Sequence, residues 1–332
     1  MKKILSTVAL LLCIHLTQAQ GNEFSSLPIS SLELPSELRK YVKKNYLFID
    51  GSGFSERFRG SDSVNLIPKN LVTTIRPRYI NKNEVSVEEY MNFVTENKGV
   101  YRKVNLHPFA ESLEGFPQNF LSQYLKDKSH KHHPMVGINR DQAMAYCEWF
   151  TQVLRLRFEA KGNFYIFGHL QTDADFRVAA LLAFGTKNRN YRNENTPPGD
   201  EYKANANYNN KHLLNPFSKA NQNKAPKLEI YNITGNVAEW VIDSPRDIKV
   251  EIKKDGKYIT TGDYHFKIPK ELKDKGTKLG IVKGGSFNQS AFYLQPGISV
   301  PLEADKGYLW VGFRPVINFY KKEEKKSQAA PN

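Results

Sequence analysis

The chain has 332 residues, of which 40% are hydrophobic and 25% charged, and it carries a formal net charge of +14. This composition supports a folded core and excludes a wholly disordered chain, and the length suits one large domain or two ordinary ones. The basic residues are dispersed, without an arginine-rich helix or a stripe of aromatic residues, so we expect a solvated basic surface and no nucleic-acid partner.

The first 19 residues have the pattern of a secretory signal peptide. Lys2 and Lys3 provide the charged start, an apolar run continues to Leu16, and Thr17-Gln18-Ala19 is a small-x-small cleavage site. We therefore predict a mature chain that begins at Gln20 and is exported, either to the periplasm or to the outer membrane. The apolar run is too short to span a bilayer, and no later stretch is apolar enough for a transmembrane helix.

The two cysteines limit the redox chemistry that the chain can support. Cys13 raises the question of a lipid anchor, but Leu10-Leu11-Leu12 lacks the small residue expected before a lipidated cysteine, and we predict no lipidation. Removal of the signal leaves Cys147 alone, so the mature protein has no internal disulfide. Because Cys147 recurs with apolar residues at helical spacing, we expect a buried thiol rather than a nucleophile.

The rest of the chain predicts one domain of short strands and a few helices. An arm over 20–45 precedes the domain, which spans 46–320, and a charged tail follows over 321–332. In chain order, the patterns of apolar and turn residues predict a helix over 35–42, a strand–turn–strand over 46–54, a strand over 73–80, helices over 84–97, 119–125, 139–160 and 172–184, an ordered loop over 185–223, a hairpin within 247–278, and closing strands over 280–287 and 309–319.

Capping residues mark the starts of three of these helices. Ser86 has Glu89 three residues later, which is the spacing of a capping box. Asn139 is a predicted cap for the longest helix, and Thr172, followed by Asp175, is a predicted cap for the last one.

Three histidines near the middle of the chain raise the possibility of a metal site. His130, His132 and His133 have only Asp127 as a nearby acid, and their spacing matches no familiar ligand set. We therefore expect them to be loop residues.

The most informative stretch runs from Tyr231 to Trp240. Thr234-Gly235-Asn236 is turn chemistry, because glycine and asparagine adopt positive φ at low cost. Val237 and Trp240 follow as candidate core residues. The stretch therefore predicts a tight turn that leads directly into the core.

Asn232 and Glu239 place side-chain oxygens on either side of this turn. Amide, carboxylate and backbone carbonyl oxygens together suit a hard cation such as Ca²⁺. A single short motif is weak support, and the spacing alone favours a structural turn with a buried Trp240 and an exposed Glu239.

Five blocks in a fixed order resemble the sulfatase-modifying-factor, or formylglycine-generating-enzyme-like, domain family. The resemblance extends from about Tyr46 to about Phe319. Its blocks are Glu84-Val85-Ser86 to Phe93, His133-Pro134-Met135-Val136-Gly137 to Trp149, Leu170 to Phe176, Gly235 to Trp240, and Gly284-Gly285-Ser286-Phe287 with Gly312-Phe313-Arg314.

The resemblance implies an α+β fold, a variant of the C-type lectin fold with little regular secondary structure and long packed loops. It also implies a structural Ca²⁺ ion. The side-chain oxygens of Asn232 and Glu239 and the backbone carbonyls of Gly235 and Val237 would be its ligands. A second calcium site of the family would fall near residues 207 and 208, where this chain differs.

The resemblance further implies that this chain lacks the catalytic thiols of the active enzymes. Those enzymes carry two cysteines after the Gly-Gly-Ser motif, whose thiolates bind copper. Here the corresponding positions are Gln289 and Leu294, and residues 288–300 contain neither cysteine nor histidine. We therefore predict no catalytic residue and no redox cofactor. Gln171 and Phe176 replace the usual proline and tryptophan of the family, without bearing on its chemistry.

These observations favour an exported, non-catalytic component of the cell envelope with protein partners. Cys-less exported members of the family include the gliding-motility and type IX secretion proteins GldJ and GldK (PorK). One alternative is altered chemistry in the same groove, with Ser286, Asn288, Gln289 and Arg314 as its polar groups. Another is a lectin-like module that binds a glycan through the tyrosines of the long loop, Tyr191, Tyr202 and Tyr208.

Overall fold

The computed structural model describes residues 34–51, 53–56, 71–97, 105–110, 113, 115–159, 162–184, 217, 219–225, 227–244, 250–254, 257–261 and 278–322. The predicted signal peptide, Cys13, the three loop tyrosines and nearly all of the predicted tail lie outside the described residues. No helix in the described part of the chain is both long and apolar enough to cross a membrane.

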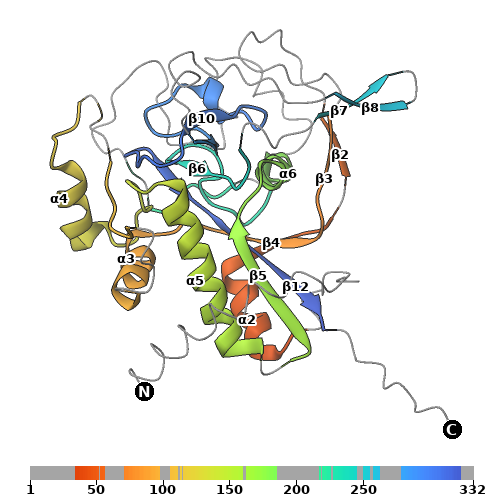
Figure 1. Ribbon diagram of the computed structural model, residues 1–332, viewed down its shortest axis with the longest axis horizontal. Helices are drawn as coiled ribbons and strands as arrows, with labels where there is room; N and C mark the ends of the chain where they lie inside the picture. The colour runs from red at the N-terminus through yellow and green to blue at the C-terminus, as the bar shows by residue number, and fades with distance from the viewer. Residues whose placement is uncertain are drawn as a thin grey trace.

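Two four-stranded sheets form the frame of the molecule (Figure 1). The first has the order β1-β4-β12-β5, and all its neighbouring strands are antiparallel. The second has the order β10-β9-β6-β11, in which β11 runs parallel to β6. The strands are β1 (Tyr46–Ile49), β4 (Arg78–Asn81), β5 (Phe164–Leu170), β6 (Ala238–Trp240), β9 (Leu279–Lys283), β10 (Val300–Glu303), β11 (Val311–Phe313) and β12 (Pro315–Lys321).

Two further strand pairs lie outside these sheets. β2 (Gly53–Glu56) pairs with β3 (Leu71–Thr74), and β7 (Val250–Lys254) pairs with β8 (Lys257–Thr261). The second pair confirms a hairpin within the region 247–278. The strand predicted over 73–80 is two strands in the structure, β3 and β4, and Pro77 lies in the break between them, where its ring fixes φ and removes a hydrogen-bond donor.

The helices agree closely with the sequence pattern. They are α2 (Ser36–Asn45), α3 (Val87–Glu96), α4 (Phe120–Lys126), α5 (Arg140–Phe158) and α6 (Asp173–Phe184), with short 3-10 helices η2 (Lys128–His130) and η6 (Ala291–Leu294). Ser86 and Glu89 form the predicted capping box, and Asn139 forms a second one with Gln142. Thr172 accepts a hydrogen bond from the Asp175 amide at 3.0 Å, as expected for a helix start.

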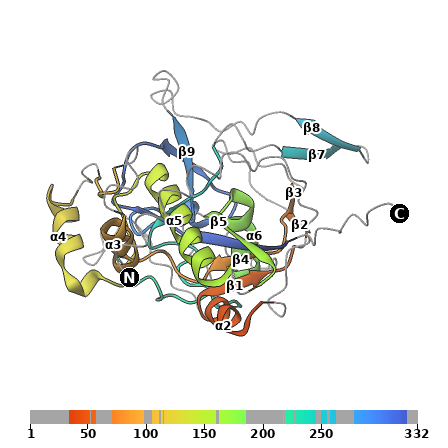
Figure 2. The same cartoon turned by 60° about the horizontal axis from the view of Figure 1, so that its bottom comes forward.

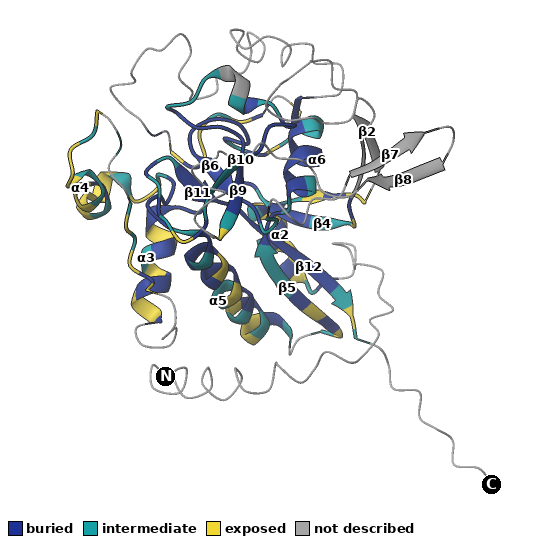
Figure 3. Cartoon of the chain, turned by 45° about the horizontal axis from the view of Figure 1, so that its top comes forward, coloured by how far each residue is buried: buried dark blue, intermediate teal, exposed yellow. Residues whose placement is uncertain are grey.

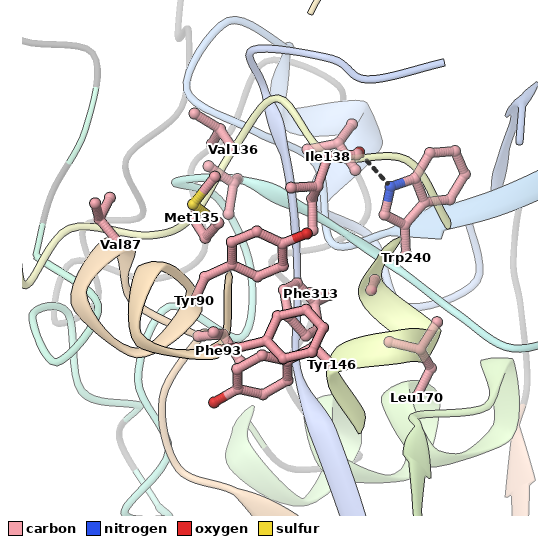
Figure 4. Close-up of a cluster of buried hydrophobic side chains, with 14 of the residues drawn as sticks. Val87, Tyr90, Phe93, Met135, Val136, Ile138, Tyr146, Leu170, Trp240 and Phe313 are labelled. Carbon is pink, nitrogen blue, oxygen red and sulfur yellow. Dashed lines mark hydrogen bonds between the residues drawn. The ribbon is translucent and has the colours of Figure 1, made fainter. Parts of the chain in front are cut away.

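Among the described residues, the core has three clusters that join the helices to the sheets. α2 and α5 pack on the first sheet, and Figure 2 shows α2 next to β1 and β4. Figure 3 shows that α3 and α5 bury one side and expose the other. In the largest cluster, Tyr90, Tyr146 and Phe313 are in ring contact, and the Trp240 indole donates to the Ile138 carbonyl at 3.1 Å (Figure 4).

Cys147 lies in the same core, where its side chain is buried and its thiol is free. Burial raises the pKa of this thiol well above its usual value, because removal from water disfavours the charged thiolate. The prediction of a buried, unreactive cysteine agrees with this environment.

We expect Ser86→Ala to lower the free energy of unfolding by about 1 kcal/mol, because the Ser86 hydroxyl caps α3 and also donates to Glu89 Oε2 at 2.7 Å. Urea unfolding followed by circular dichroism measures the change. Ser129→Ala removes an exposed hydroxyl and is the matched control. Equal midpoints for the two variants would contradict the role of the cap.

Candidate functional site

The stretch from Tyr231 to Trp240 forms a buried loop that ends in β6. Asn232, Gly235 and Asn236 adopt φ values of 47°, 80° and 66°, which confirms the predicted turn chemistry. Two backbone hydrogen bonds tie this loop to the next motif. Gly235 N donates to the Gly284 carbonyl at 2.8 Å, and Phe287 N donates to the Asn236 carbonyl at 2.9 Å.

The Gly-Gly-Ser turn follows β9 and packs tightly against η6. Gly284 and Gly285 have φ values of 89° and 66°, so both positions favour glycine. A Cβ added at Gly285 would lie 2.9 Å from Leu294 Cδ2 and from the Tyr293 backbone. The Leu294 side chain is fully buried, and it therefore fills the space directly under the turn by apolar packing.

The hydroxyl of Ser286 is buried next to amide oxygens. Ser286 Oγ lies 2.6 Å from Asn288 Oδ1 and 3.1 Å from Gln289 Oε1, and it has one proton to donate. An amide oxygen is too weak a base to activate a serine for nucleophilic attack. The structure therefore brings together three of the four polar residues considered for altered chemistry, but it gives Ser286 no general base among the described contacts.

Glu239 and Arg314 form a buried ion pair behind the loop. Glu239 is 1% exposed, so the expectation of an exposed Glu239 is wrong. Arg314 Nη2 lies 2.7 Å from Glu239 Oε1, its Nε lies 3.2 Å from both carboxylate oxygens, and Gln171 Nε2 donates to Glu239 Oε2. The sequence pattern contained no signal for this pairing, because Gln171 and Arg314 are far from Glu239 in the chain.

Glu84 is a second buried carboxyl group that contacts the loop. Its Oε2 accepts hydrogen bonds from Asn232 Nδ2 at 2.9 Å and from Asn236 Nδ2 at 2.8 Å, whereas its Oε1 is buried without a hydrogen-bond partner among the described residues. Burial, followed by the nearby charge of Glu239, raises the pKa of Glu84 well above its usual value, against an opposing effect of Arg314. The hydrogen bonds from Asn232 and Asn236 favour the ionised carboxylate, but burial and the charge of Glu239 outweigh them and favour a proton on Glu84.

The predicted calcium ligands fall into two groups. Both Glu239 oxygens are bound by Arg314 and Gln171, and a cation there would have to displace a guanidinium. Asn232 Nδ2 points at Glu84, at the Lys219 carbonyl (3.0 Å) and at the Ala220 carbonyl (3.3 Å). Asn232 Oδ1 accepts a hydrogen bond from Asn223 Nδ2 at 2.8 Å, which supports this orientation of the amide. If the amide were flipped, its oxygen would lie among the three acceptors, an arrangement that suits a cation.

The fit to calcium is therefore partial. Asn232 lies among oxygens that suit Ca²⁺, with Glu84 as the nearest carboxyl group, but Glu239 already has a cationic partner. No hydrogen bond among the described residues brings the carbonyls of Gly235 and Val237 to this point. Calcium stays a prediction at this loop.

A further group of buried charges lies beside the Gly-Gly-Ser turn. Lys283 Nζ lies 2.7 Å from Asp173 Oδ1 and 2.8 Å from Ser299 Oγ, and Arg177 Nε lies 3.0 Å from Asp173 Oδ2. Burial alone would raise the pKa of Asp173, but the two cations outweigh it and lower the pKa to about 2. Lys283 thus has an ionised partner, and this group anchors the turn to α6.

Two of the three histidines, His130 and His133, lie next to aromatic rings, whereas His132 Nδ1 lies 3.6 Å from Glu88 Oε2. The rings of His130 and His133 lie 4.9 Å apart, and that of His130 lies 4.8 Å from the Tyr124 ring. Within the described ranges, no three His, Cys, Asp or Glu side chains are arranged to hold a metal ion. Burial, together with the His130 charge, lowers the pKa of His133.

The fold and this loop define a mixed α+β domain in which a Gly-Gly-Ser turn packs on a polar, buried loop. Residues 35–319 match the sulfatase-modifying factor enzyme 1-like domain, and the chain therefore belongs to that family. This result confirms the resemblance and the predicted fold class. No curated protein sequence matches the chain.

Several solved structures share the fold, among them the three described below. PvdO from Pseudomonas aeruginosa superposes with a TM-score of 0.54 at 14% identity over 82% of this chain and 94% of that chain. CarF superposes with a TM-score of 0.51 at 14% identity over 82% of this chain and 97% of that chain. Variable protein 1 of Treponema denticola superposes with a TM-score of 0.51 at 16% identity over 82% of this chain and 94% of that chain. At these identities the likeness concerns the fold alone.

We expect Glu84→Gln to change the pH dependence of stability. The pKa of Glu84 in the folded protein lies above the ordinary value of 4.5. Its contribution to the free energy of unfolding is therefore fully present below pH 4.5 and is lost as the pH rises through the folded pKa. Glutamine mimics the protonated acid and does not titrate. As the pH rises above about 4.5, the wild type should therefore lose stability relative to Glu84→Gln, as measured by urea unfolding. The exposed control Glu96→Gln should follow the wild type, and parallel curves for all three proteins would refute a protonated Glu84.

We expect Ca²⁺ to raise the midpoint of thermal unfolding relative to EDTA, by the equivalent of about 3 kcal/mol at a hundredfold excess over its dissociation constant.

Glu239→Ala should lower stability in both buffers, because it leaves the Arg314 guanidinium buried without its partner. If EDTA leaves the unfolding midpoint of the wild type unchanged, the prediction that this loop binds calcium is wrong.

Proposed function

We propose that this protein is an exported, non-catalytic member of the sulfatase-modifying-factor family that acts as a structural or binding component of the cell envelope. Typical members of the family are enzymes. The observation that carries the proposal is the identity of the two residues after the Gly-Gly-Ser turn, Gln289 and Leu294, at the positions where the active enzymes have cysteines.

The packing of these two residues supports the proposal. The Leu294 side chain is fully buried next to the turn, and Gln289 contacts Ser286, so both positions take part in the fold without a thiol. Cys147 does not replace them, because its thiol is buried on α5 and has a raised pKa. Copper and oxygen chemistry needs thiolate ligands that these residues do not supply.

The envelope role rests on the predicted signal peptide together with the family fold. GldJ and GldK (PorK) are the Cys-less exported relatives that suggest gliding motility or type IX secretion as its setting. Protein partners in the envelope are expected, with a structural Ca²⁺ ion near Asn232 as part of the same proposal. Crosslinking of a tagged mature chain in the envelope, followed by mass spectrometry, identifies such partners.

The test of the catalytic half of the proposal uses copper. We expect the mature wild type, incubated with Cu(I) and a cysteine-containing peptide, to retain no stoichiometric copper and to consume no oxygen. The double variant Gln289→Cys with Leu294→Cys should bind copper, since two thiolates are soft ligands for Cu(I). Gln289→Ser with Leu294→Val is the control for packing changes. Copper-dependent oxygen consumption by the wild type would overturn the proposal.

A further inference from the structure

β5 is the last strand of the first sheet, and one of its edges is free of a partner strand among the described strands. Two backbone hydrogen bonds lie at the two ends of the pairing between β5 and β12. Lys322 N donates to the Asn163 carbonyl at 3.1 Å, and Gln171 N donates to the Arg314 carbonyl at 3.3 Å. Hydrogen-bonded pairs recur every second residue in an antiparallel ladder. The odd-numbered residues of β5 therefore bond to β12, and the even-numbered residues direct their N–H and C=O groups to the free edge.

α5 closes the free edge at one point. The Ile166 amide donates to Glu159 Oε1 at 2.7 Å, and the Ile166 carbonyl accepts from Arg155 Nε at 2.7 Å. Arg155 and Glu159 are also an ion pair at 3.3 Å. Arg155 of α5 and Glu159, the residue that follows the helix, thus satisfy both backbone groups of one residue, which is a common way to block an edge strand.

The edge is open two residues further along. No described side chain caps the N–H and C=O of Gly168 in this way, while the Leu170 carbonyl lies 2.6 Å from His169 Nδ1. A cavity of about 470 Å³ lies between this part of β5 and α5. Figure 1 shows the two elements side by side, with β12 on the other side of β5. The apolar lining includes Met144, Phe167 and Ile242.

The rim of this cavity carries carboxylates on a chain that is otherwise strongly basic. Asp141 and Glu148 lie two turns apart on α5, and both line the cavity. Asp141 is bound by Lys278 at 2.9 Å, whereas the exposed Glu148 has no ion-pair partner among the described residues. Arg155 also lines the cavity, where it is paired with Glu159. The site therefore combines the unpaired backbone groups of Gly168, an apolar hollow and one unpaired carboxylate, that of Glu148.

We propose that this edge binds an extended peptide segment of another protein by strand addition. The peptide backbone bonds to Gly168, one apolar side chain of the peptide enters the cavity, and a lysine or arginine of the peptide pairs with Glu148. Main-chain hydrogen bonds supply affinity and alternate side chains supply specificity in this mode of recognition. The site is on the first sheet, away from the Gly-Gly-Ser turn, so it does not depend on the proposed loss of catalysis.

The test uses fluorescein-labelled heptapeptides of the pattern Lys-Xaa-Thr-Xaa-Thr-Xaa-Lys, with valine, isoleucine or phenylalanine at Xaa, and the full mature chain. Fluorescence anisotropy should show saturable binding at concentrations below about 1 mM. Methylation of the backbone nitrogens in one alternate set of peptide residues should weaken binding by about tenfold or more, whereas methylation of the other set should leave it unchanged, since only one set faces β5.

Glu148→Lys should weaken binding about fivefold, because it replaces an attractive charge with a repulsive one on an exposed surface. Glu96→Lys makes the same charge change on α3 and should have no effect. Absence of binding by every peptide, equal effects of both methylation patterns, or self-association of the chain that Glu148→Lys abolishes would each overturn the proposal. The last result would assign the edge to a second copy of this chain.

Discussion

A buried ion pair holds the two sheets of this domain together. Arg314 is the single residue between β11 and β12, at the point where the chain passes from the second sheet to the first. Its guanidinium binds Glu239 of β6, the Asn81 carbonyl of β4 at 2.9 Å and the Tyr231 carbonyl of the motif loop at 2.8 Å. Removal of either charge would leave the other buried in the core without a partner. The free energy of unfolding would then fall by about 3–5 kcal/mol. The position of the motif loop relative to both sheets follows from this contact.

This arrangement separates the frame of the domain from any chemistry at its Gly-Gly-Ser turn. Backbone hydrogen bonds from Gly235 and Phe287 hold the turn in place, and they do not depend on which side chains stand at positions 289 and 294. A leucine at 294 stabilises the turn by packing where a cysteine would offer a ligand. A member of this family can therefore keep its fold while the reactive groups change, and a binding role can then develop elsewhere, such as at the free edge of β5.

Local sequence patterns predicted the helices well and the strands less well. The caps at Ser86 and Asn139 depend on atoms within a few residues of one another, so the chain specifies them directly. β5, β6 and β10 were not predicted. β6 has three residues, all buried, and β10 has four of intermediate burial, so neither shows the alternation that marks a half-buried strand. In β5, glycine stands at position 168 because a Cβ there would lie 2.3 Å from Thr151 Oγ1. This glycine interrupts the apolar pattern of the strand.

The sequence by itself determined the family, the turn at Gly235 and Asn236, and the absence of cysteines after the Gly-Gly-Ser motif. Only the tertiary structure decided which groups meet the polar residues of the loop. Glu239 reads as an exposed acid beside a turn, yet it is buried because Arg314, 75 positions away in the chain, neutralises it. Glu84, 148 positions from Asn232, enters the same cluster in the same way. Partners so distant leave no periodic signal, because burial of a charge depends on the approach of its counter-charge in space.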